Sequence, residues 1–298
     1  MIVALIVLYH PSVPLLTRLL RGVSRQVDFI VAVDNSPHDL EDQHGLFESY
    51  GSKVSYTSLG VNVGIAAAQN IGIRKAKAVG ATHILFLDQD SAVSEGMVSV
   101  LIQSELRLVN SGIKVAAVGP VFVDEKQRKR LPAIRHRFLF VQRIDIAEDQ
   151  REPVPVDYLI SSGSLIRTSV LEEVGPMMQE LFIDWVDIEW GLRARSKRYQ
   201  SFMIPTALML HSIGDAAVTL FGRGVNLHND VRNYYIVRNA TFLLRSPAMG
   251  WSWRIVTTLK IPLYLIFYSW CSQDKLKSFR LLLRAFSDGI RGAVGQLR

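Results

Sequence analysis

Residues 84–90, the central feature of this chain, have the sequence ILFLDQD. Its first four residues are apolar, as in a strand buried within a sheet, and they run directly into Asp88, Gln89 and Asp90. Two carboxylates at positions i and i+2 of a tight turn can converge on one divalent cation, because Mg²⁺ and Mn²⁺ prefer oxygen ligands. The alternative is a turn in which the aspartates only accept local hydrogen bonds.

The sequence on either side of this strand alternates between two patterns. Continuous apolar runs predict strands, and apolar residues spaced three or four apart predict helices. Strands are predicted at residues 3–8, 29–33, 54–59, 84–87 and 115–118, and helices at 15–23, 64–78 and 98–109. This alternation predicts an α/β fold with a mostly parallel central sheet flanked by helices.

Polar residues follow three of the predicted strands. Tyr9, Asp34 and Asp88 each come directly after an apolar run. Sheets of this kind bind ligands at the carboxyl ends of their strands, so these residues are candidates for one binding site. The sequence has neither a GxGxxG loop nor a GxxxxGK[ST] loop, which argues against a dinucleotide site and a P-loop.

Beyond Pro120 the alternation weakens. Residues 124–152 are rich in charge and predict an exposed excursion. Helical spacing over residues 181–195 predicts a helix on which Asp184 and Asp187, three residues apart, would share one face. Two further apolar runs predict strands at residues 156–160 and 202–210.

The composition excludes several classes of protein. Of the 298 residues 49% are hydrophobic and 20% are charged, so a large core is possible and a disordered chain is excluded. The one cysteine, Cys271, excludes internal disulfides and cysteine-built zinc sites, and it favours a reducing compartment. The net charge of +7 suits an anionic partner, either phospholipid or a phosphorylated substrate. No motif of nucleic-acid binding is present, and we expect no nucleic-acid partner.

Roughly the last 80 residues differ in kind from the rest. Aromatic residues crowd one segment and include Trp251, Trp253, Tyr264 and Trp270, which is the pattern of a membrane interface. The following segment, 279–297, has apolar residues at helical spacing with basic residues on the other side. This predicts helices that lie on an anionic membrane surface. The alternative is helices that pack on the core with a solvated basic face.

Seven motifs, in order, resemble the inverting glycosyltransferases of family 2, which have the GT-A fold. They are LYHP before residue 12, VAVDNSP at 31–37, NVGIAAAQN at 62–70, FLDQD at 86–90, DYLISSGS at 157–164, FIDWVDIEWGLRAR at 182–195 and HSIG at 211–214. The resemblance covers residues 1–240. Four stretches, among them Tyr235-x-x-Arg238-Asn239, are most similar to bacterial rhamnosyltransferases of polysaccharide assembly, which use dTDP-rhamnose.

The resemblance implies an organisation and an activity. Residues 1–245 would form the GT-A domain, with a nucleotide-sugar half at 1–120 and an acceptor and catalytic half at 121–245. Residues 246–298 would form a helical, membrane-associating region. The protein would transfer L-rhamnose from dTDP-L-rhamnose to a polyprenyl-diphosphate-linked saccharide in O-antigen synthesis. It would be cytoplasmic and peripheral on the inner face of the cell membrane.

The resemblance also implies roles for individual residues. Asp187 would be the general base, with Asp184 as its rival and Glu189 as a further catalytic candidate. A divalent metal, Mg²⁺ or Mn²⁺, would be bound by Asp90, Asp88 and His211. The nucleotide sugar would contact Tyr9, Asp34, Asn62, Gly64, Asn70, Asp88, Gln89, Arg232 and Arg238. The acceptor or its sugar would contact Ser162, Gly163 and Trp185.

Three alternatives stay open from the sequence. The first is a family 2 enzyme with a UDP-sugar donor. The second is a membrane-bound scaffold that binds nucleotide sugars without catalysis, which the intact acidic residues oppose. The third is a nucleotidyltransferase, which the lack of a glycine-rich phosphate loop opposes. Whether the protein forms a homo-oligomer is also left open.

Overall fold

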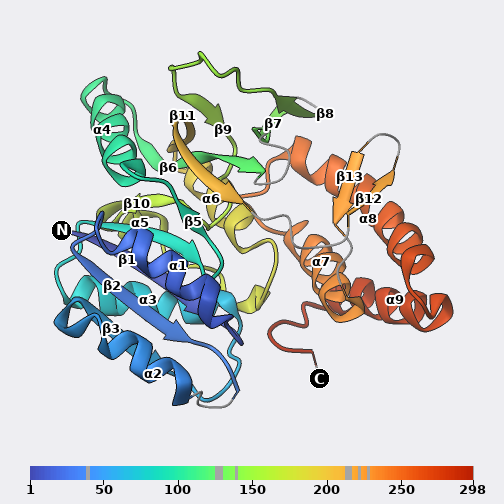
Figure 1. Cartoon of the computed structure of the whole chain (residues 1–298). Helices are drawn as coiled ribbons and strands as arrows, with labels where there is room; N and C mark the ends of the chain where they lie inside the picture. Colours follow the sequence, from blue (N-terminus) through green and yellow to red (C-terminus); the bar gives the residue numbers. More distant parts are fainter. Residues whose placement is uncertain are drawn as a thin grey trace.

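The computed structural model of the protein describes residues 1–37, 41–124, 130–137, 140–211, 217–220, 223–226 and 229–297. Within these residues a nine-stranded sheet forms the centre of the molecule, with helices on both faces (Figure 1). Its strand order is β3-β2-β1-β4-β10-β6-β11-β5, and β9 pairs with β11. The α/β fold predicted from the alternating pattern is confirmed.

The first half of the sheet is parallel. It contains β1 (Ile2–Leu8), β2 (Phe29–Asp34), β3 (Val54–Ser58) and β4 (His83–Asp88). The strand β1 lies between β2 and β4, with Leu8 paired to Asp34 and Val7 paired to Asp88. The polar residues that follow these strands are therefore brought to one edge, as predicted.

The second half of the sheet is mixed. It contains β5 (Ala92–Val93), β6 (Val115–Asp124), β9 (Val154–Val156), β10 (Leu165–Arg167) and β11 (Gln200–His211). The pair β6 and β11 is parallel, whereas β10 runs antiparallel between β4 and β6. The strand predicted at 156–160 is wrong beyond Val156, because a turn follows in which Gly163 has a φ of 80°.

Helices cover the two faces because successive strand residues point to opposite sides. One face packs against α3, and the other packs against α1 and α4. The helices of this part are α1 (Val13–Val23), α2 (Glu41–Glu48), α3 (Ile65–Ala78), α4 (Met97–Asn110), α5 (Thr168–Val174) and α6 (Val186–Ser196), with 3₁₀ turns at Gly51–Lys53 and Gln179–Leu181.

Two small antiparallel pairs lie outside the main sheet. The first pair, β7 (Ala133–Arg137) and β8 (Phe140–Ile144), falls within the excursion predicted at 124–152. The second pair is β12 (Ala217–Leu220) and β13 (Arg223–Asn226). The charged sequence of the excursion thus carries a short hairpin rather than an unstructured loop.

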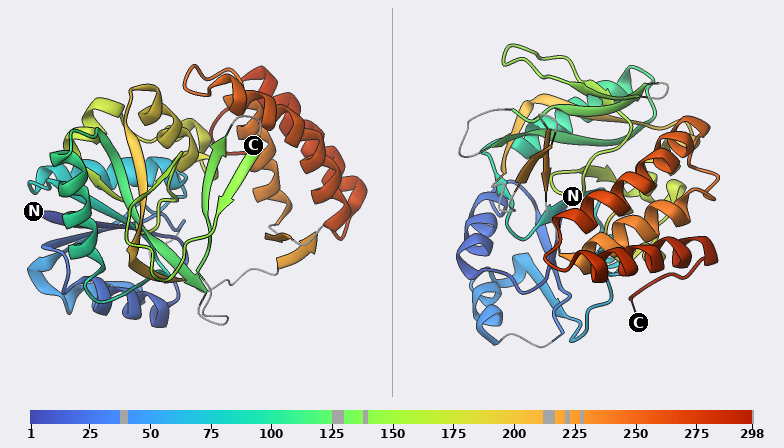
Figure 2. Two further views of the ribbon diagram at one scale, coloured as in Figure 1. Left: turned by 90° about the horizontal axis from the view of Figure 1, so that it is seen from above. Right: turned by 90° about the vertical axis from the view of Figure 1, so that its right-hand side faces the viewer.

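Three helices complete the chain and lie beside the sheet rather than on its faces (Figure 2). They are α7 (Asp230–Leu243), α8 (Trp251–Cys271) and α9 (Lys275–Arg291). The indole of Trp253 donates a hydrogen bond to Asp157 at 3.1 Å, which joins α8 to the sheet half of the molecule. Within the described residues, none of the helices combines the length and the apolar character needed to cross a membrane.

Candidate active site

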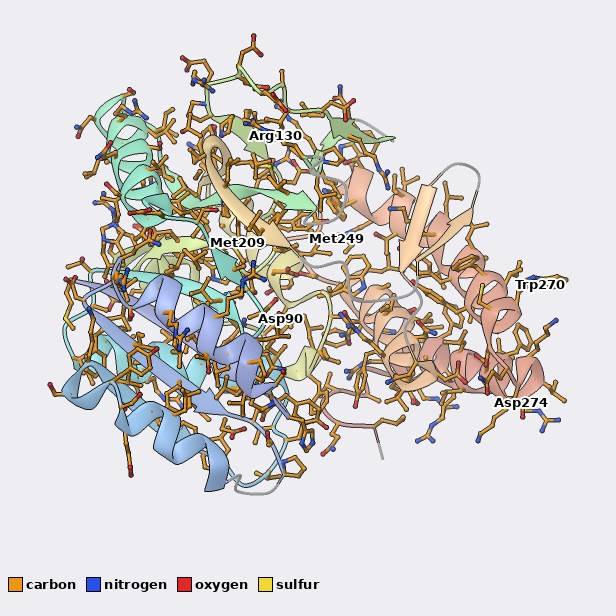
Figure 3. All side chains as sticks on the ribbon, viewed as in Figure 1. Asp90, Arg130, Met209, Met249, Trp270 and Asp274 are labelled. Carbon is orange, nitrogen blue, oxygen red and sulfur yellow. The ribbon has the colours of Figure 1, made fainter. Side chains whose placement is uncertain are left out.

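The Asp88-Gln89-Asp90 turn lies where β4 ends, near the middle of the molecule in Figure 3. Gln89 fixes the turn to the end of β1, because its side chain accepts from the Tyr9 amide at 2.7 Å and donates to the Tyr9 carbonyl at 3.1 Å. This leaves Asp88 and Asp90, both exposed to solvent, as the acids that the turn presents to a ligand.

A second turn, residues 160–164, packs against the same strand end. The Gly163 amide donates to the Phe86 carbonyl at 2.7 Å, and the Ser162 hydroxyl accepts from the Asp88 amide at 3.4 Å. A Cβ on Gly163 would lie 2.7 Å from the ring of Pro120, so only glycine fits. The predicted pair Ser162 and Gly163 therefore lies beside Asp88.

Asp187 lies in the first turn of α6, where its carboxyl accepts from the Ile188 amide at 2.9 Å. Burial raises the pKa of Asp187 to about 6, and the charge of Asp184 acts in the same direction. Hydrogen bonds from the backbone of Ile188 and Ser161 oppose the shift. A carboxyl with such a pKa can accept a proton near neutral pH, as a general base must.

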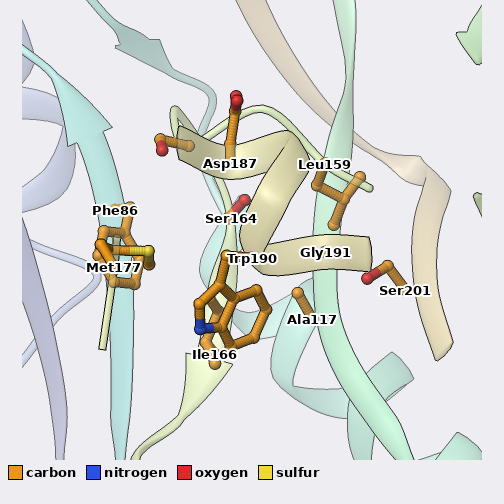
Figure 4. A pocket seen from close by; sticks show the side chains of 11 residues that line it. Phe86, Ala117, Leu159, Ser164, Ile166, Met177, Asp187, Trp190, Gly191 and Ser201 are labelled. Atoms are coloured by element: carbon orange, nitrogen blue, oxygen red, sulfur yellow. The ribbon is translucent and has the colours of Figure 1, made fainter. Parts of the chain in front are cut away.

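A small cavity lies next to Asp187 (Figure 4). Its volume is about 20 Å³, which is room for one water molecule. Ser164, Trp190 and Gly191 contribute to its wall, and the side chains of Asp187 and Trp190 point in opposite directions from α6. The cavity is too small for a sugar.

Asp184 is not on the helix that carries Asp187, and this prediction is wrong. The backbone of Phe182, Asp184 and Trp185 has φ values of 65°, 62° and 65°, so α6 begins only at Val186. The backbone of a residue other than glycine rarely adopts a positive φ, and this conformation persists only where the surroundings impose it. The segment 182–185 turns the Asp184 carboxylate toward Arg232 of α7, whose Nη2 lies 3.1 Å from Asp184 Oδ1.

These acids share one electrostatic environment. Asp88 is exposed, yet the protein packed around its carboxyl limits hydration, and this burial raises the pKa of Asp88 to about 6. The charges of Asp90 and Asp187 raise the pKa of Asp88 further, and the Arg232 guanidinium opposes them. The structure thus brings Asp88, Asp90, Asp187 and Arg232 into one electrostatic environment, which Asp184 joins through its ion pair with Arg232.

The donor set of this site fits a divalent cation. Asp88 and Asp90 offer oxygen ligands that solvent reaches, and their mutual repulsion is what a bound cation would relieve. Within the described side chains no group of three or more acids, histidines or cysteines forms a complete metal site. His211 ends β11, but its side chain lies outside the described part of the chain. The remaining coordination is what substrate phosphates and water supply to Mg²⁺.

Four predicted site residues are held by the fold instead. Asn70 exchanges hydrogen bonds with the backbone of Met177, 2.8 Å each way, and Glu189 pairs with Arg193 at 2.9 Å. Arg238 is 2% exposed, and its guanidinium donates to backbone carbonyls, so the fold already uses the side chain that was predicted to contact the nucleotide sugar. Asp34 is fully buried, and its two oxygens accept from the Ser36 amide and the Tyr56 hydroxyl. Its contact with the nucleotide base stays a prediction.

Asn62 and Gly64 shape the loop before α3. The Asn62 side chain accepts from the Gly64 amide at 3.0 Å and from the Asn35 amide group at 2.9 Å. Gly64 has a φ of 85°, and a Cβ there would lie 2.5 Å from the ring of Phe182. Tyr9 follows β1 and is 46% exposed, whereas Trp185 is buried and directly precedes α6. Gly64 thus lets the loop approach the segment that precedes Asp187.

The sequence interpretation missed three residues of the site. The hydroxyl of Ser91 lies 2.6 Å from that of Ser162 and 3.1 Å from the Asp88 amide. Ser161 hydrogen-bonds Asp187, and Tyr158 packs against Gly191, one turn along α6 from Asp187. The motif DYLISSGS contained Tyr158 and Ser161, but its spacing alone could not show that they face α6.

Comparison with known proteins identifies the family of this chain. Residues 4–175 match glycosyl transferase family 2. The chain belongs to this family. It is also 35% identical over 297 residues to the dTDP-rhamnosyl transferase RfbF of Shigella flexneri, a match that covers 99% of this chain and 97% of the relative.

Solved structures confirm the fold of this family 2 chain. GalNAc-T7 with UDP, GalNAc and Mn²⁺ superimposes with a TM-score of 0.63 at 13% identity, over 98% of this chain and 56% of that one. Staphylococcus aureus TarS gives a TM-score of 0.63 at 13% identity, over 98% and 49%. TarS 1-349 in complex with UDP-GlcNAc gives 0.59 at 14% identity, over 98% and 82%. The chain spans about half the length of the first two, and the predicted GT-A fold is confirmed.

Proposed function

We propose that this family 2 protein transfers L-rhamnose from dTDP-L-rhamnose to a polyprenyl-diphosphate-linked saccharide in O-antigen synthesis. The observation that carries the proposal is that Asp187, whose pKa is raised to about 6, lies close enough to the acidic turn for its charge to raise the pKa of Asp88. The dTDP-rhamnosyl transferase RfbF, which is similar over nearly its whole length, supports the choice of donor.

The reaction would be a single displacement with inversion. The acceptor hydroxyl oxygen attacks the anomeric carbon of the donor, and the bond from that carbon to the diphosphate oxygen breaks. Asp187 accepts the proton that the hydroxyl loses, and dTDP leaves with the bonding electron pair. Asp184 cannot share this role readily, because its carboxylate is held by Arg232 in the ion pair. That contact favours Asp187 over its rival.

A divalent cation would be held by Asp88 and Asp90, with His211 as a further candidate ligand. Such a cation supplies charge neutralisation to a departing diphosphate. GalNAc-T7, which shares the fold, was solved with Mn²⁺. Arg232 would stabilise the same leaving group. Its charge already acts on Asp88, whose pKa it lowers, and its guanidinium can donate two parallel hydrogen bonds to phosphate oxygens.

Residues 246–298 would bring the enzyme to the inner face of the cell membrane, while residues 1–245 form the catalytic domain. Support comes from a stripe of exposed apolar residues at helical spacing along α8, which we name the α8 stripe. It consists of Trp251, Ile255, Leu259, Leu263, Ile266 and Trp270, which are between 42% and 71% exposed. The helix α9, which packs against α8, carries exposed basic residues, including Lys277 and Arg280. Apolar and basic surfaces together suit an anionic bilayer.

The test of the activity is a donor panel. The full chain is incubated with Mn²⁺, synthetic polyprenyl-diphosphate-linked saccharides and dTDP-L-rhamnose, UDP-galactose or UDP-N-acetylglucosamine, and the products are identified by mass spectrometry. Rhamnosylated product from the dTDP donor alone supports the proposal. Product from a UDP donor alone would instead select the alternative donor class, which the UDP-containing structures of the fold represent. No turnover with any donor would favour a scaffold.

A further inference from the structure

A buried arginine, Arg238, hydrogen-bonds the backbone of the segment that precedes Asp187. Arg238 of α7 donates through Nη2 to the carbonyls of Leu181 at 3.0 Å and Gly295 at 3.2 Å. Through Nη1 it donates to the carbonyl of Ala293 at 3.0 Å and, at 3.4 Å, to that of Glu180. One guanidinium therefore joins two parts of the chain that are more than a hundred residues apart, the turn before α6 and the residues after α9.

The neighbouring residue, Asn239, holds the left-handed part of that segment. Its side-chain amide donates to the carbonyls of Leu181 at 2.9 Å, Ile183 at 2.7 Å and Asp184 at 3.0 Å. Asn239 is fully buried, so water does not compete for these hydrogen bonds at its side chain. A backbone with three residues at positive φ persists only where its surroundings over-determine it, and Asn239 supplies that constraint.

The residues after α9 complete the arrangement. The amide of Gly295 donates to the carbonyl of Glu180 at 2.8 Å, and the amide of Leu297 donates to the hydroxyl of Tyr235 at 2.7 Å. The ring of Tyr235 stacks on Phe182, with centroids 5.1 Å apart. We name residues 293–297 the C-terminal strap. The strap, α7 and the 180–185 segment thus hold one another in place.

We propose that Tyr235, Arg238, Asn239 and the C-terminal strap are a positioning device for the catalytic base. They hold residues 181–185, three of which have a positive φ, in the conformation from which α6 starts, and they thereby fix where Asp187 points. Asn239 contacts the backbone carbonyl of Asp184, and Arg238 contacts the carbonyls of Glu180 and Leu181, so the device acts through the backbone. The inference rests on the proposed function, because it takes Asp187 to be the base. It also gives a role to the Tyr235-x-x-Arg238-Asn239 motif that substrate contact does not explain.

The expected consequence is a loss of turnover without a loss of donor binding. If the strap is absent, the 181–185 segment can return to an ordinary backbone conformation, and the first turn of α6 shifts with it. A displacement of about 1 Å at a reacting group can lower the rate about 100-fold. The acidic turn after β4 belongs to other elements and keeps its place, so donor affinity is expected to change little.

Two adjacent tyrosines provide a matched pair of variants. Tyr235→Phe removes the acceptor of the strap but keeps the ring that stacks on Phe182. Tyr234→Phe removes a comparable buried hydroxyl, which donates to Asp288 of α9 at 2.7 Å and does not touch the strap. A third variant ends the chain at Ala293 and so removes most of the strap.

The experiment measures hydrolysis of dTDP-L-rhamnose with Mn²⁺, in which water takes the place of the acceptor, together with donor binding by calorimetry. We expect kcat to fall about threefold or more in Tyr235→Phe and about tenfold or more in the chain ending at Ala293. KM and donor affinity are expected to change less than about twofold. Tyr234→Phe is expected to retain kcat, even where its Tm falls as much as that of Tyr235→Phe.

Equal kcat values for Tyr235→Phe and Tyr234→Phe, with full activity of the chain that ends at Ala293, would overturn the inference. So would a rise in KM as large as the fall in kcat, since that would indicate general loss of the site. Asp187→Asn separates this from failure of the proposed function. If Asp187→Asn hydrolyses the donor normally, the base assignment is wrong; if it is inactive while the strap variants are not, only the positioning role is wrong.

Discussion

Arg232 of α7 and Asp184, which lies two residues before the start of α6, are joined by an ion pair in which Nε lies 3.2 Å from both carboxylate oxygens. The pair links two elements that are 48 residues apart in sequence. Arg232 also lowers the pKa of Asp88, so its charge acts on the acidic turn as well. This double role supports the proposal that Arg232 meets the departing diphosphate.

We therefore predict that Arg232→Gln raises KM for dTDP-L-rhamnose about 10- to 100-fold, since charge-assisted hydrogen bonds to phosphate are lost. Arg232→Lys is expected to recover only part of this, because an ammonium group lacks the two-pronged geometry. Asp184→Asn is the control: it removes the partner and keeps the arginine. Steady-state kinetics measure the effect, and an unchanged KM in Arg232→Gln would remove this residue from the donor site.

The pKa of Asp187 leads to a prediction about pH. A general base works only when deprotonated, so kcat is expected to rise about tenfold per pH unit below about pH 6 and to level off above it. Because the charge of Asp184 raises the pKa of Asp187, Asp184→Asn is expected to move the inflection to lower pH. Turnover is measured at saturating donor and Mn²⁺. A profile that is flat across this range would argue against Asp187 as the base.

The sequence predicted those parts of the site that depend on local pattern. An apolar run that ends in Asp88 predicts a strand end, and parallel pairing then places that acid beside the end of β1. That Asp187 lies on a helix also followed from its spacing, although its place in the first turn did not. These features could be predicted because burial and periodicity act over a few residues.

The sequence could not predict contacts made by backbone in unusual conformations. Helical spacing extended through Asp184, and only the positive φ values of Phe182, Asp184 and Trp185 show that α6 starts later. Arg238 is similar: an arginine in a basic chain suggests phosphate binding, yet its partners are carbonyls, which any residue provides. The amino-acid sequence does not show where backbone carbonyls lie, so the contacts of Arg238 with them could not be predicted.

Asp187 also allows a prediction about stability. Its pKa in the folded protein is about 6, above the ordinary value of 3.8, so folding disfavours its charged form. The folded state therefore binds more protons between these values, and the wild-type protein loses stability as pH rises through this window. Asp187→Asn keeps an oxygen for the Ile188 amide and has no charge. We predict that its Tm exceeds that of the wild type above about pH 6, with a smaller difference near pH 4.

Thermal unfolding in EDTA at the two pH values measures this difference. Asp145→Asn, at an exposed aspartate of the excursion, is the matched control and is expected to leave Tm nearly unchanged at both. A wild-type protein that is more stable than Asp187→Asn above pH 6 would show that the carboxylate is stabilised by the fold, contrary to the raised pKa.

Gly64 yields a prediction about the loop that meets the segment before α6. Alanine there would face both a left-handed backbone and a Cβ only 2.7 Å from the Phe182 carbonyl oxygen. Gly60→Ala is the control, because Gly60 also has a positive φ but no atom within 4 Å of the added Cβ. We expect Gly60→Ala to lower the free energy of unfolding by about 1–2 kcal/mol, from backbone strain alone. Gly64→Ala is expected to lower it by more, as measured by urea unfolding. Equal losses would mean that Phe182 yields to the added methyl group.

The α8 stripe gives the last prediction, that the protein binds anionic vesicles through α8 and α9. Leu259 and Leu263 are 66% and 62% exposed, so replacing both by aspartate leaves the packed face of α8 intact. Each buried leucine contributes about 1.5–3 kcal/mol on transfer from water, and loss of both is expected to lower vesicle partitioning about 100-fold or more. Binding is also expected to weaken with added salt, because the basic residues of α9 contribute through charge.

Co-sedimentation with phosphatidylglycerol-containing vesicles measures this binding, and vesicles of phosphatidylcholine alone test the dependence on charge. Leu106→Asp is the matched control, since Leu106 is a 44% exposed leucine on α4, outside α8 and α9. It is expected to bind vesicles as the wild type does. If the wild-type protein stays in the supernatant, or if Leu106→Asp and the α8 double variant lose binding equally, then the exposed face of α8 does not contact lipid.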